Sequence, residues 1–139
     1  MNPPKKGDVW VYDYLWRREH EAGAEHGRKP RPTALVTTIV GVDGRTNLFI
    51  LPITSKEPRK DRLAIEIPQM ERKRAHLASD MRLWVMLDEY NHDCLETSFY
   101  FDPNGRQGAF SPVFTKKALG LFVEAMRNRL VKAVPRHDD

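Results

Sequence analysis

Two loops of this sequence contain residue types that bind phosphate groups. The first loop ends in Arg28-Lys29-Pro30-Arg31-Pro32, directly before an apolar run at residues 33–40. The second begins with Thr54-Ser55-Lys56, directly after an apolar run at residues 48–53. Arginine offers a planar and permanently charged fork of donors, and hydroxyl groups add short hydrogen bonds to further oxygens. Together these groups would suit a phosphodiester, provided that folding brings the two loops into contact.

The two apolar runs predict how the loops meet. Residues 33–40 and 48–53 have the pattern of strands, and residues 41–47 between them include an Asp-Gly pair typical of hairpin turns. In an antiparallel hairpin the start of the first strand lies beside the end of the second, so Arg31 and Thr54 are predicted to be neighbours. The pattern also allows a second interpretation, in which prolines fix a loop of solvated charges and the hydroxyl residues only form a turn.

Aromatic residues alternate along the segment that precedes the first loop. Residues 7–16 predict a strand, and residues 17–32 predict a long charged loop without helix or strand periodicity. The aromatic side chains that share one face of this strand are Trp10, Tyr12, Tyr14 and Trp16. Such a face is typical of a core or a dimer surface, although Tyr14 or Trp16 could instead stack on a nucleobase.

The remaining elements are predicted to be short strands followed by one helix. Strands are expected at residues 63–67, 82–87 and 97–101, with a helical turn within residues 69–77. From Thr115 the apolar period becomes helical, which predicts an amphipathic C-terminal helix over about residues 115–133 with Thr115 as its N-cap. We therefore expect a single domain over residues 1–139, mainly β in an α+β class, built as a small antiparallel barrel or half-barrel carrying this helix.

Charge is distributed unevenly along the chain, whose formal net charge is +4. Residues 1–75 contain 15 basic and 10 acidic residues, a balance of +5, whereas residues 80–102 contain one basic and six acidic residues, a balance of −5. This asymmetry predicts two electrostatic faces, with any nucleic acid bound against the N-terminal half.

Several function classes are not indicated. The lone Cys94 cannot form an intramolecular disulfide, and the histidines do not have the spacing of a zinc site, so no metal site is expected. Glycine-rich phosphate motifs are absent, so no cofactor is expected. The longest apolar run, at residues 48–53, is too short to span a membrane, and the first residues do not resemble a signal peptide. The expected location is the cytoplasm.

Four segments, in order, resemble the PemK/MazF family of toxins from type II toxin–antitoxin systems. They are GDVWVYDY at residues 7–14, the loop from Gly23 to Pro32, the strand TALVTTIV at residues 33–40, and LPITS at residues 51–55. The likeness extends over residues 5–92. It implies an SH3-like barrel with a terminal helix and a homodimer that inhibits growth by cutting single-stranded RNA, mainly mRNA, without metal. It also implies a cognate antitoxin protein as partner.

The resemblance implies roles for residues of both loops. Arg31 corresponds to the catalytic arginine of the family and Thr54 to its catalytic threonine. In metal-free cleavage the 2′-hydroxyl of RNA attacks the phosphorus, so Arg31 would stabilise the phosphorane and Thr54 would hold a phosphate oxygen. Glu25 or His26 is the expected proton acceptor. The residues expected to bind RNA phosphates are Arg28, Lys29, Ser55 and Lys56.

The sequence departs from the family pattern in three places. The loop between Glu25 and Arg31 is one residue longer than is usual in the family, with Lys29-Pro30 as the extra material, and the tail beyond His92 is longer. The third departure lies in a later strand. Where relatives show an acid, a glutamine and then an arginine, this chain has Asp88-Glu89-Tyr90-Asn91, so an acidic patch replaces a basic contact. The alternative function is a non-catalytic binding protein on the same barrel, either a CcdB-like inhibitor of gyrase or a relative that binds nucleic acid or peptide without cleaving it. In that case Trp10, Tyr12 and the acidic residues 80–102 would form interfaces.

Overall fold

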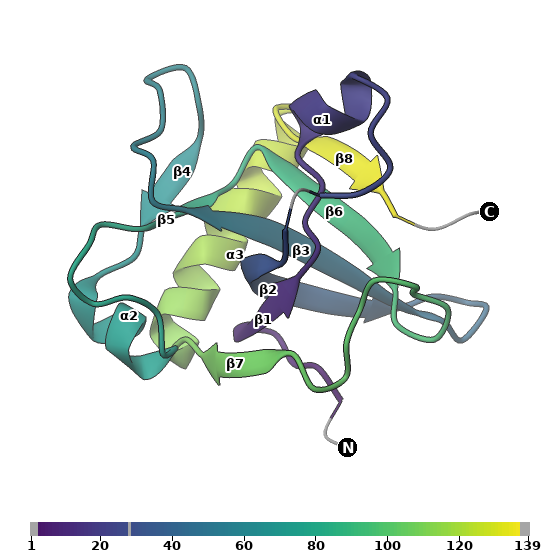
Figure 1. Ribbon diagram of the computed structural model, residues 1–139, viewed down its shortest axis with the longest axis horizontal. Coiled ribbons are helices and arrows are strands. Elements are labelled where there is room, and N and C mark those ends of the chain that lie inside the picture. Colours follow the sequence, from purple (N-terminus) through teal and green to yellow (C-terminus); the bar gives the residue numbers. More distant parts are fainter. Residues whose placement is uncertain (1–2, 28, 137–139) are drawn as a thin grey trace.

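The computed structural model describes residues 3–27 and 29–136, which form mainly antiparallel β-structure with three helices (Figure 1). In chain order the elements are β1 (Asp8–Tyr12), α1 (Arg17–Glu21), β2 (Arg31–Val40), β3 (Thr46–Thr54), β4 (Ala64–Glu66), α2 (Gln69–Arg74), β5 (Trp84–Met86), β6 (Glu89–Cys94), β7 (Arg106–Ala109), α3 (Pro112–Arg127) and β8 (Lys132–Pro135). No helix within these described residues is long and apolar enough to cross a membrane.

Strand β3 organises the sheet because it pairs along both of its edges. One edge pairs with β2 as an antiparallel hairpin, and the other pairs with β6 over Asn47–Ile50 and with β5 at Ile53 and Thr54. Strands β1 and β7 extend the sheet beyond β2, β4 extends it beyond β5, and β8 joins β6 in parallel. The predicted antiparallel α+β class is confirmed. In residues 3–27 and 29–136 no pairing joins the outer strands to one another, so the sheet does not close into a barrel.

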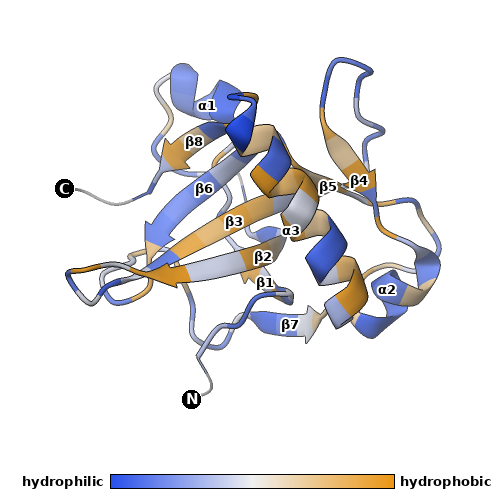
Figure 2. Cartoon of the chain, turned by 180° about the vertical axis from the view of Figure 1, so that it is seen from behind, coloured by the Kyte–Doolittle hydropathy of each residue, from blue (hydrophilic) through white to orange (hydrophobic). Residues whose placement is uncertain are grey.

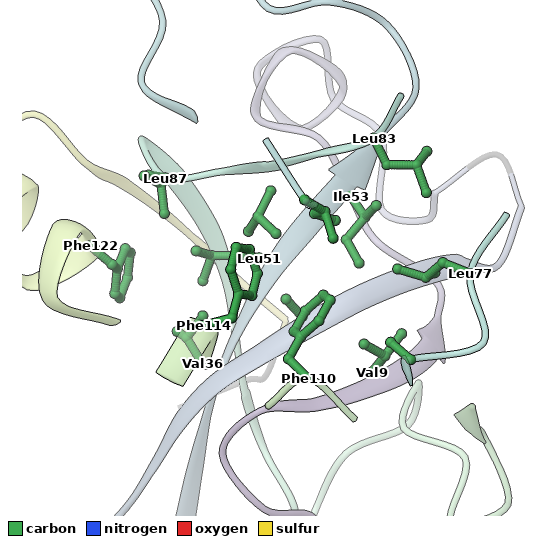
Figure 3. Packing of buried hydrophobic residues seen from close by; sticks show 14 of the residues in the cluster. Val9, Val36, Leu51, Ile53, Leu77, Leu83, Leu87, Phe110, Phe114 and Phe122 are labelled. Carbon is green, nitrogen blue, oxygen red and sulfur yellow. The ribbon is translucent and has the colours of Figure 1, made fainter. Parts of the chain in front are cut away.

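A helix-side core fills the space between the sheet and α3. Figure 2 shows α3 lying across β2 and β3, and Figure 3 shows its Phe114 and Phe122 beside strand residues such as Val36 and Leu51. Ser111 begins the helix, because its hydroxyl accepts the Phe114 N–H at 3.2 Å and Pro112 occupies the first turn. Helix α3 therefore covers one sheet face and leaves the opposite face to a second core.

The second core, which we call the aromatic core, contains the alternating aromatic residues of the first strand segment. Trp10, Tyr12, Tyr14 and Trp16 are all buried in it, as the core interpretation predicted. The Tyr12 hydroxyl donates to Asp93 at 2.8 Å, and the Tyr14 hydroxyl donates to Glu89 at 3.0 Å. Burial first, and then the neighbouring carboxylates, raise the pKa of Tyr12 and of Tyr14 well above the usual value of 10.0.

The predicted strand at residues 97–101 and the predicted continuous loop at residues 17–32 are both wrong. Residues 95–97 form a turn, and the Ser98 hydroxyl, which accepts the N–H groups of Tyr100 and Phe101, folds the following residues locally. The strand in this region is instead β6, a mostly polar segment in which polar and apolar residues do not alternate. Helix α1 interrupts the expected loop because Glu19 accepts the Trp16 N–H at 3.1 Å and so starts a short helix.

The C-terminal helix is displaced from its predicted bounds. It begins after Ser111 instead of at Thr115 and ends at Arg127, before the predicted residue 133. Arg129 adopts a left-handed φ of 57°, and its N–H bonds to the Met126 carbonyl, which stops the helix. The chain then continues as β8, a short strand that pairing with β6 stabilises and that local periodicity does not reveal.

The buried tyrosines predict a loss of stability at alkaline pH. The folded protein keeps Tyr12 and Tyr14 protonated, whereas both ionise in the unfolded chain near pH 10. Stability is therefore fully present below about pH 10 and should fall above it by about 1.4 kcal/mol per pH unit for each tyrosine. Urea unfolding at a series of pH values measures this slope. Tyr14→Phe should reduce the slope, and an unchanged slope in that variant would contradict the assignment.

Candidate active site

Arg31 and Thr54 line the same cleft, which has a volume of about 500 Å³. The β2–β3 register pairs Thr33 with Pro52, and its continuation by two residues brings Arg31 opposite Thr54. This confirms the predicted neighbourhood of the two residues. The residues that line the cleft are Trp16, Arg18, Arg31, Thr54, Lys56, Glu57, Pro58, Arg59, Arg62 and Met86.

Arg31 is held in the cleft by packing and not by an ion pair. It is half-buried at the first position of β2, and its guanidinium carbon lies 5.4 Å from the centroid of the Trp16 ring. Within residues 3–27 and 29–136 no carboxylate pairs with Arg31, and its buried Nε has no hydrogen-bond acceptor. Its positive charge is therefore available to an anion that enters the cleft.

Thr54 contributes a hydroxyl from the last position of β3. The Lys56 N–H donates to the Thr54 Oγ1 at 3.1 Å, which fixes the hydroxyl oxygen at the strand end. The hydroxyl hydrogen can still donate to a ligand. Lys56 is exposed and lines the cleft, and Ser55 between them is exposed. Thr54 and Lys56 thus offer one hydroxyl donor and one ammonium group to an anion.

The cleft has an excess of positive charge. Arg18 packs on the Trp16 ring at 4.8 Å, and neither Arg18 nor Lys56 has a carboxylate partner in the described part of the chain. Arg59 is compensated by Asp61 at 3.3 Å. Three cations without a partner, Arg18, Arg31 and Lys56, therefore face one lining carboxylate, Glu57. A polyanion is the ligand class that this balance favours.

Arg62 anchors the loop that forms one wall of the cleft. Its guanidinium donates to both oxygens of Asp88 at 2.7 and 2.8 Å and to Glu89 at 3.0 Å. The bidentate hydrogen bonding to Asp88 raises the pKa of Arg62 above its already high usual value. The contacts tie the loop between β3 and β4 to the start of β6 and leave Arg62 little free charge for a ligand.

The acidic segment of the sequence is partly turned inward. Glu89 and Asp93 are buried and Asp88 is partly buried, so the expected acidic face is wrong for these three of the six carboxylates in residues 80–102. Glu89 accepts from the Tyr14 hydroxyl and, at 2.9 Å, from the Arg17 N–H. The carboxylates therefore satisfy donors of the aromatic core and of the cleft wall.

Strand β6 also fixes the backbone next to Trp16. The side-chain amide of Asn91 accepts the Leu15 N–H at 2.8 Å and donates to the Leu15 carbonyl at 2.7 Å. With the Glu89 contact to Arg17, this holds the residues on both sides of Trp16. The segment Asp88-Glu89-Tyr90-Asn91, which departs from the family pattern, thus positions the ring on which Arg31 packs.

The two expected proton acceptors do not line the cleft. Glu25 lies at a separate hollow of about 730 Å³ that also involves Tyr100 and Arg136, and its carbonyl accepts the Tyr100 hydroxyl at 3.4 Å. The His26 ring contacts Tyr100 edge-on, with centroids 5.7 Å apart. The carboxylate at the cleft is Glu57, which the sequence analysis missed. Its position three residues after Thr54 was the available signal.

The other residues expected at the site differ in whether they line the cleft. Arg28 lies outside the described residues, and Lys29 is exposed and is not among the residues that line the cleft. Tyr14 is completely buried and cannot stack on a base, whereas Trp16 is buried but lines the cleft. In residues 3–27 and 29–136 no group of histidine, cysteine or acidic side chains is arranged to hold a metal ion.

Comparison of the sequence with models of known protein families found no match, and comparison with curated proteins also found none.

The role of Arg62 as an anchor can be tested against a second arginine. Arg62→Met leaves Asp88 and the buried Glu89 without their cation, and should lower the free energy of unfolding by about 1–3 kcal/mol once the partial exposure of Arg62 is allowed for. Arg82→Met is the matched control, because its pairs with Glu57 and Glu66 are exposed and should contribute little. Urea unfolding compares the variants, and equal losses would contradict the anchoring role.

Proposed function

We propose that the protein is a metal-independent endoribonuclease that cuts single-stranded RNA and acts as the toxin of a toxin–antitoxin system. The observation that carries the proposal is the cleft in which an arginine without a counter-ion lies near a threonine hydroxyl. The ordered resemblance to the PemK/MazF family supports the same activity. Arg31 and Thr54 are the residues on which both arguments agree.

The chemistry uses the 2′-hydroxyl of RNA as the nucleophile. Attack on the adjacent phosphorus forms a phosphorane, and the 5′-oxygen departs and takes a proton from solvent, which leaves a 2′,3′-cyclic phosphate and a 5′-hydroxyl. Arg31 donates to the phosphate oxygens, where negative charge increases in the transition state, and one such donor typically lowers a barrier by about 3–4 kcal/mol. The Thr54 hydroxyl holds a further phosphate oxygen. DNA lacks the 2′-hydroxyl and is not a substrate.

The proposal assigns binding of the flanking phosphates to the other free cations of the cleft. Lys56 follows Thr54 directly, and Arg18 lies on the same Trp16 ring as Arg31. Both lack a carboxylate partner among the described residues, so each can bind a phosphate without breaking an existing pair. Binding of this kind weakens as salt is added, because phosphate neutralisation releases counterions.

The 2′-hydroxyl proton needs an acceptor, and we assign this role to Glu57. It is the carboxylate among the residues that line the cleft, and it lies in the loop that begins with Thr54. Arg82 donates to Glu57 at 3.2 Å, which helps to hold the carboxylate at the cleft.

The wider proposal includes the fold type and the partners that the family resemblance implies. Short antiparallel strands followed by a packed helix support an SH3-like barrel variant whose strand ring is open. A homodimer and a cognate antitoxin in the cytoplasm would need apolar contact surfaces. Exposed apolar side chains that could serve are Ile39, Val40, Val42, Leu121, Met126 and Leu130.

The nuclease activity can be tested with purified protein and single-stranded RNA in excess EDTA. We expect fragments that carry 2′,3′-cyclic phosphate and 5′-hydroxyl ends. Arg31→Ala should lower the cleavage rate by about 100- to 1,000-fold, and Thr54→Val should also lower it, because each removes a donor to the reacting phosphate. Arg59→Ala is the control, since Arg59 lines the cleft but is already paired with Asp61.

Intact RNA under all conditions would contradict the nuclease proposal. RNA binding that Arg31→Ala weakens, without any cleavage by the unaltered protein, would instead support the non-catalytic alternative. Expression of the gene without its neighbours adds a second readout, because a ribonuclease toxin should stop growth as RNA is lost, before any change in DNA topology.

The assignment of Glu57 is tested by Glu57→Gln, which keeps the size of the side chain and removes the proton acceptor. The cleavage rate should fall by about 100-fold or more, the usual contribution of a positioned base. Glu66→Gln is the matched control, since Glu66 also accepts from Arg82 but does not line the cleft. An equal effect of the two substitutions would show that Glu57 acts only by holding Arg82.

A further inference from the structure

Two buried donors at the cleft have no acceptor. Among the described residues the buried side-chain polar atoms without a partner are Trp16 Nε1, Arg31 Nε, Arg72 Nε and Thr115 Oγ1. The first two belong to side chains that line the same cleft and contact each other. Trp16 is only 5% exposed, so water cannot freely solvate its indole. Buried donors are normally satisfied, because leaving one unpaired costs free energy.

A second tryptophan shows that the fold can supply an acceptor in this core. Trp10 belongs to the same aromatic core, and its indole Nε1 donates to Asp8 at 3.4 Å. Trp16 has no equivalent, although the bonds of Leu15 to Asn91 and of Arg17 to Glu89 fix the backbone on both sides of it. The unpaired indole is therefore held in place by the fold.

We propose that the Trp16 Nε1–H and the Arg31 Nε–H, both closed to solvent in the unliganded protein, become accessible through a local side-chain shift and together bind one phosphate group of the substrate. This inference rests on the proposed function and makes Trp16 a substrate-binding residue that also positions Arg31. A phosphodiester carries two charged non-bridging oxygens, which can accept from both donors at once. A neutral ligand could accept from the donors but would leave the charges of Arg18, Arg31 and Lys56 uncompensated.

The two roles of Trp16 depend on different parts of its side chain. The ring face holds the guanidinium carbons of Arg31 at 5.4 Å and of Arg18 at 4.8 Å, as in cation–π contacts. The indole N–H at the ring edge is the donor to phosphate. Trp16→Phe keeps an aromatic face and removes the donor, so it separates phosphate binding from the positioning of Arg31.

The test follows individual N–H signals by NMR as inorganic phosphate is added, with sodium chloride at equal ionic strength as the reference. The chain has three tryptophans, so ¹⁵N-labelled protein shows three indole signals, and single Trp→Phe variants assign them. We expect phosphate to shift the Trp16 indole and the Arg31 Nε–H signals together and to saturate both. The signals of Trp10 and Trp84 should stay in place. Failure of the Trp16 signal to move, whether or not Arg31 responds, would overturn the inference.

The substitution Trp16→Phe should weaken phosphate binding by about tenfold or more, as followed through the Arg31 signal, because it removes one hydrogen bond to a charged group. It should also raise KM for RNA, and it should lower the thermal midpoint only through the ring volume lost from the aromatic core, since the deleted donor has no acceptor there. Trp10→Phe is the matched control: it removes the same ring volume and also the bond to Asp8, so it should lower the midpoint further while leaving phosphate binding intact. A lower midpoint with unchanged phosphate binding in Trp16→Phe would assign Trp16 a purely structural role.

The cleavage assay separates this inference from the proposed function. If the protein cuts RNA but the Trp16 signal ignores phosphate, the inference fails and the nuclease proposal stands. If phosphate moves the Trp16 and Arg31 signals but no RNA is cut, the anion site stands and the nuclease proposal fails.

Discussion

Polar side chains of β6 hold the backbone on both sides of Trp16, and the position of Arg31 depends on that contact. Asn91 binds both backbone groups of Leu15, and Glu89 accepts the Arg17 N–H. Each buried hydrogen bond contributes about 1 kcal/mol net, and more is lost when one partner is removed and the other stays buried. The Trp16 ring is thereby fixed, and it holds the Arg31 guanidinium without neutralising its charge.

This arrangement explains how an acidic segment can lie behind a basic cleft. Glu89 and Asp93 are satisfied by tyrosine hydroxyls of the aromatic core, and Asp88 is satisfied by Arg62 of the cleft wall. Their charges are used to organise the protein, while Arg18, Arg31 and Lys56 keep theirs for a ligand. An arginine held by an aromatic ring keeps its full attraction for phosphate, whereas one held by a carboxylate would have to exchange partners on binding.

Local pattern was sufficient where neighbouring residues decide the structure. The alternation of Trp10, Tyr12 and Tyr14 correctly predicted a shared buried face, and the hairpin correctly brought Arg31 to Thr54.

Local pattern was insufficient where contacts between distant parts of the chain decide the structure. Strand β6 is polar and lacks alternation because its side chains bind groups far along the chain, and β8 forms only because β6 accepts it as a parallel neighbour. Glu25 and His26 lie close to Arg31 in sequence, but helix α1 and the following turn place Glu25 at another hollow and the His26 ring against Tyr100.

The sequence by itself determined the antiparallel class and the meeting point of the two loops that carry Arg31 and Thr54, because strand alternation and hairpin pairing are short-range and have a fixed geometry. Only the tertiary structure decided which charges remain free. Whether a carboxylate faces solvent, an arginine or a buried tyrosine depends on residues that are many positions away in the chain. For the same reason, only the folded chain placed Glu57 at the cleft and left the Trp16 indole without an acceptor beside Arg31.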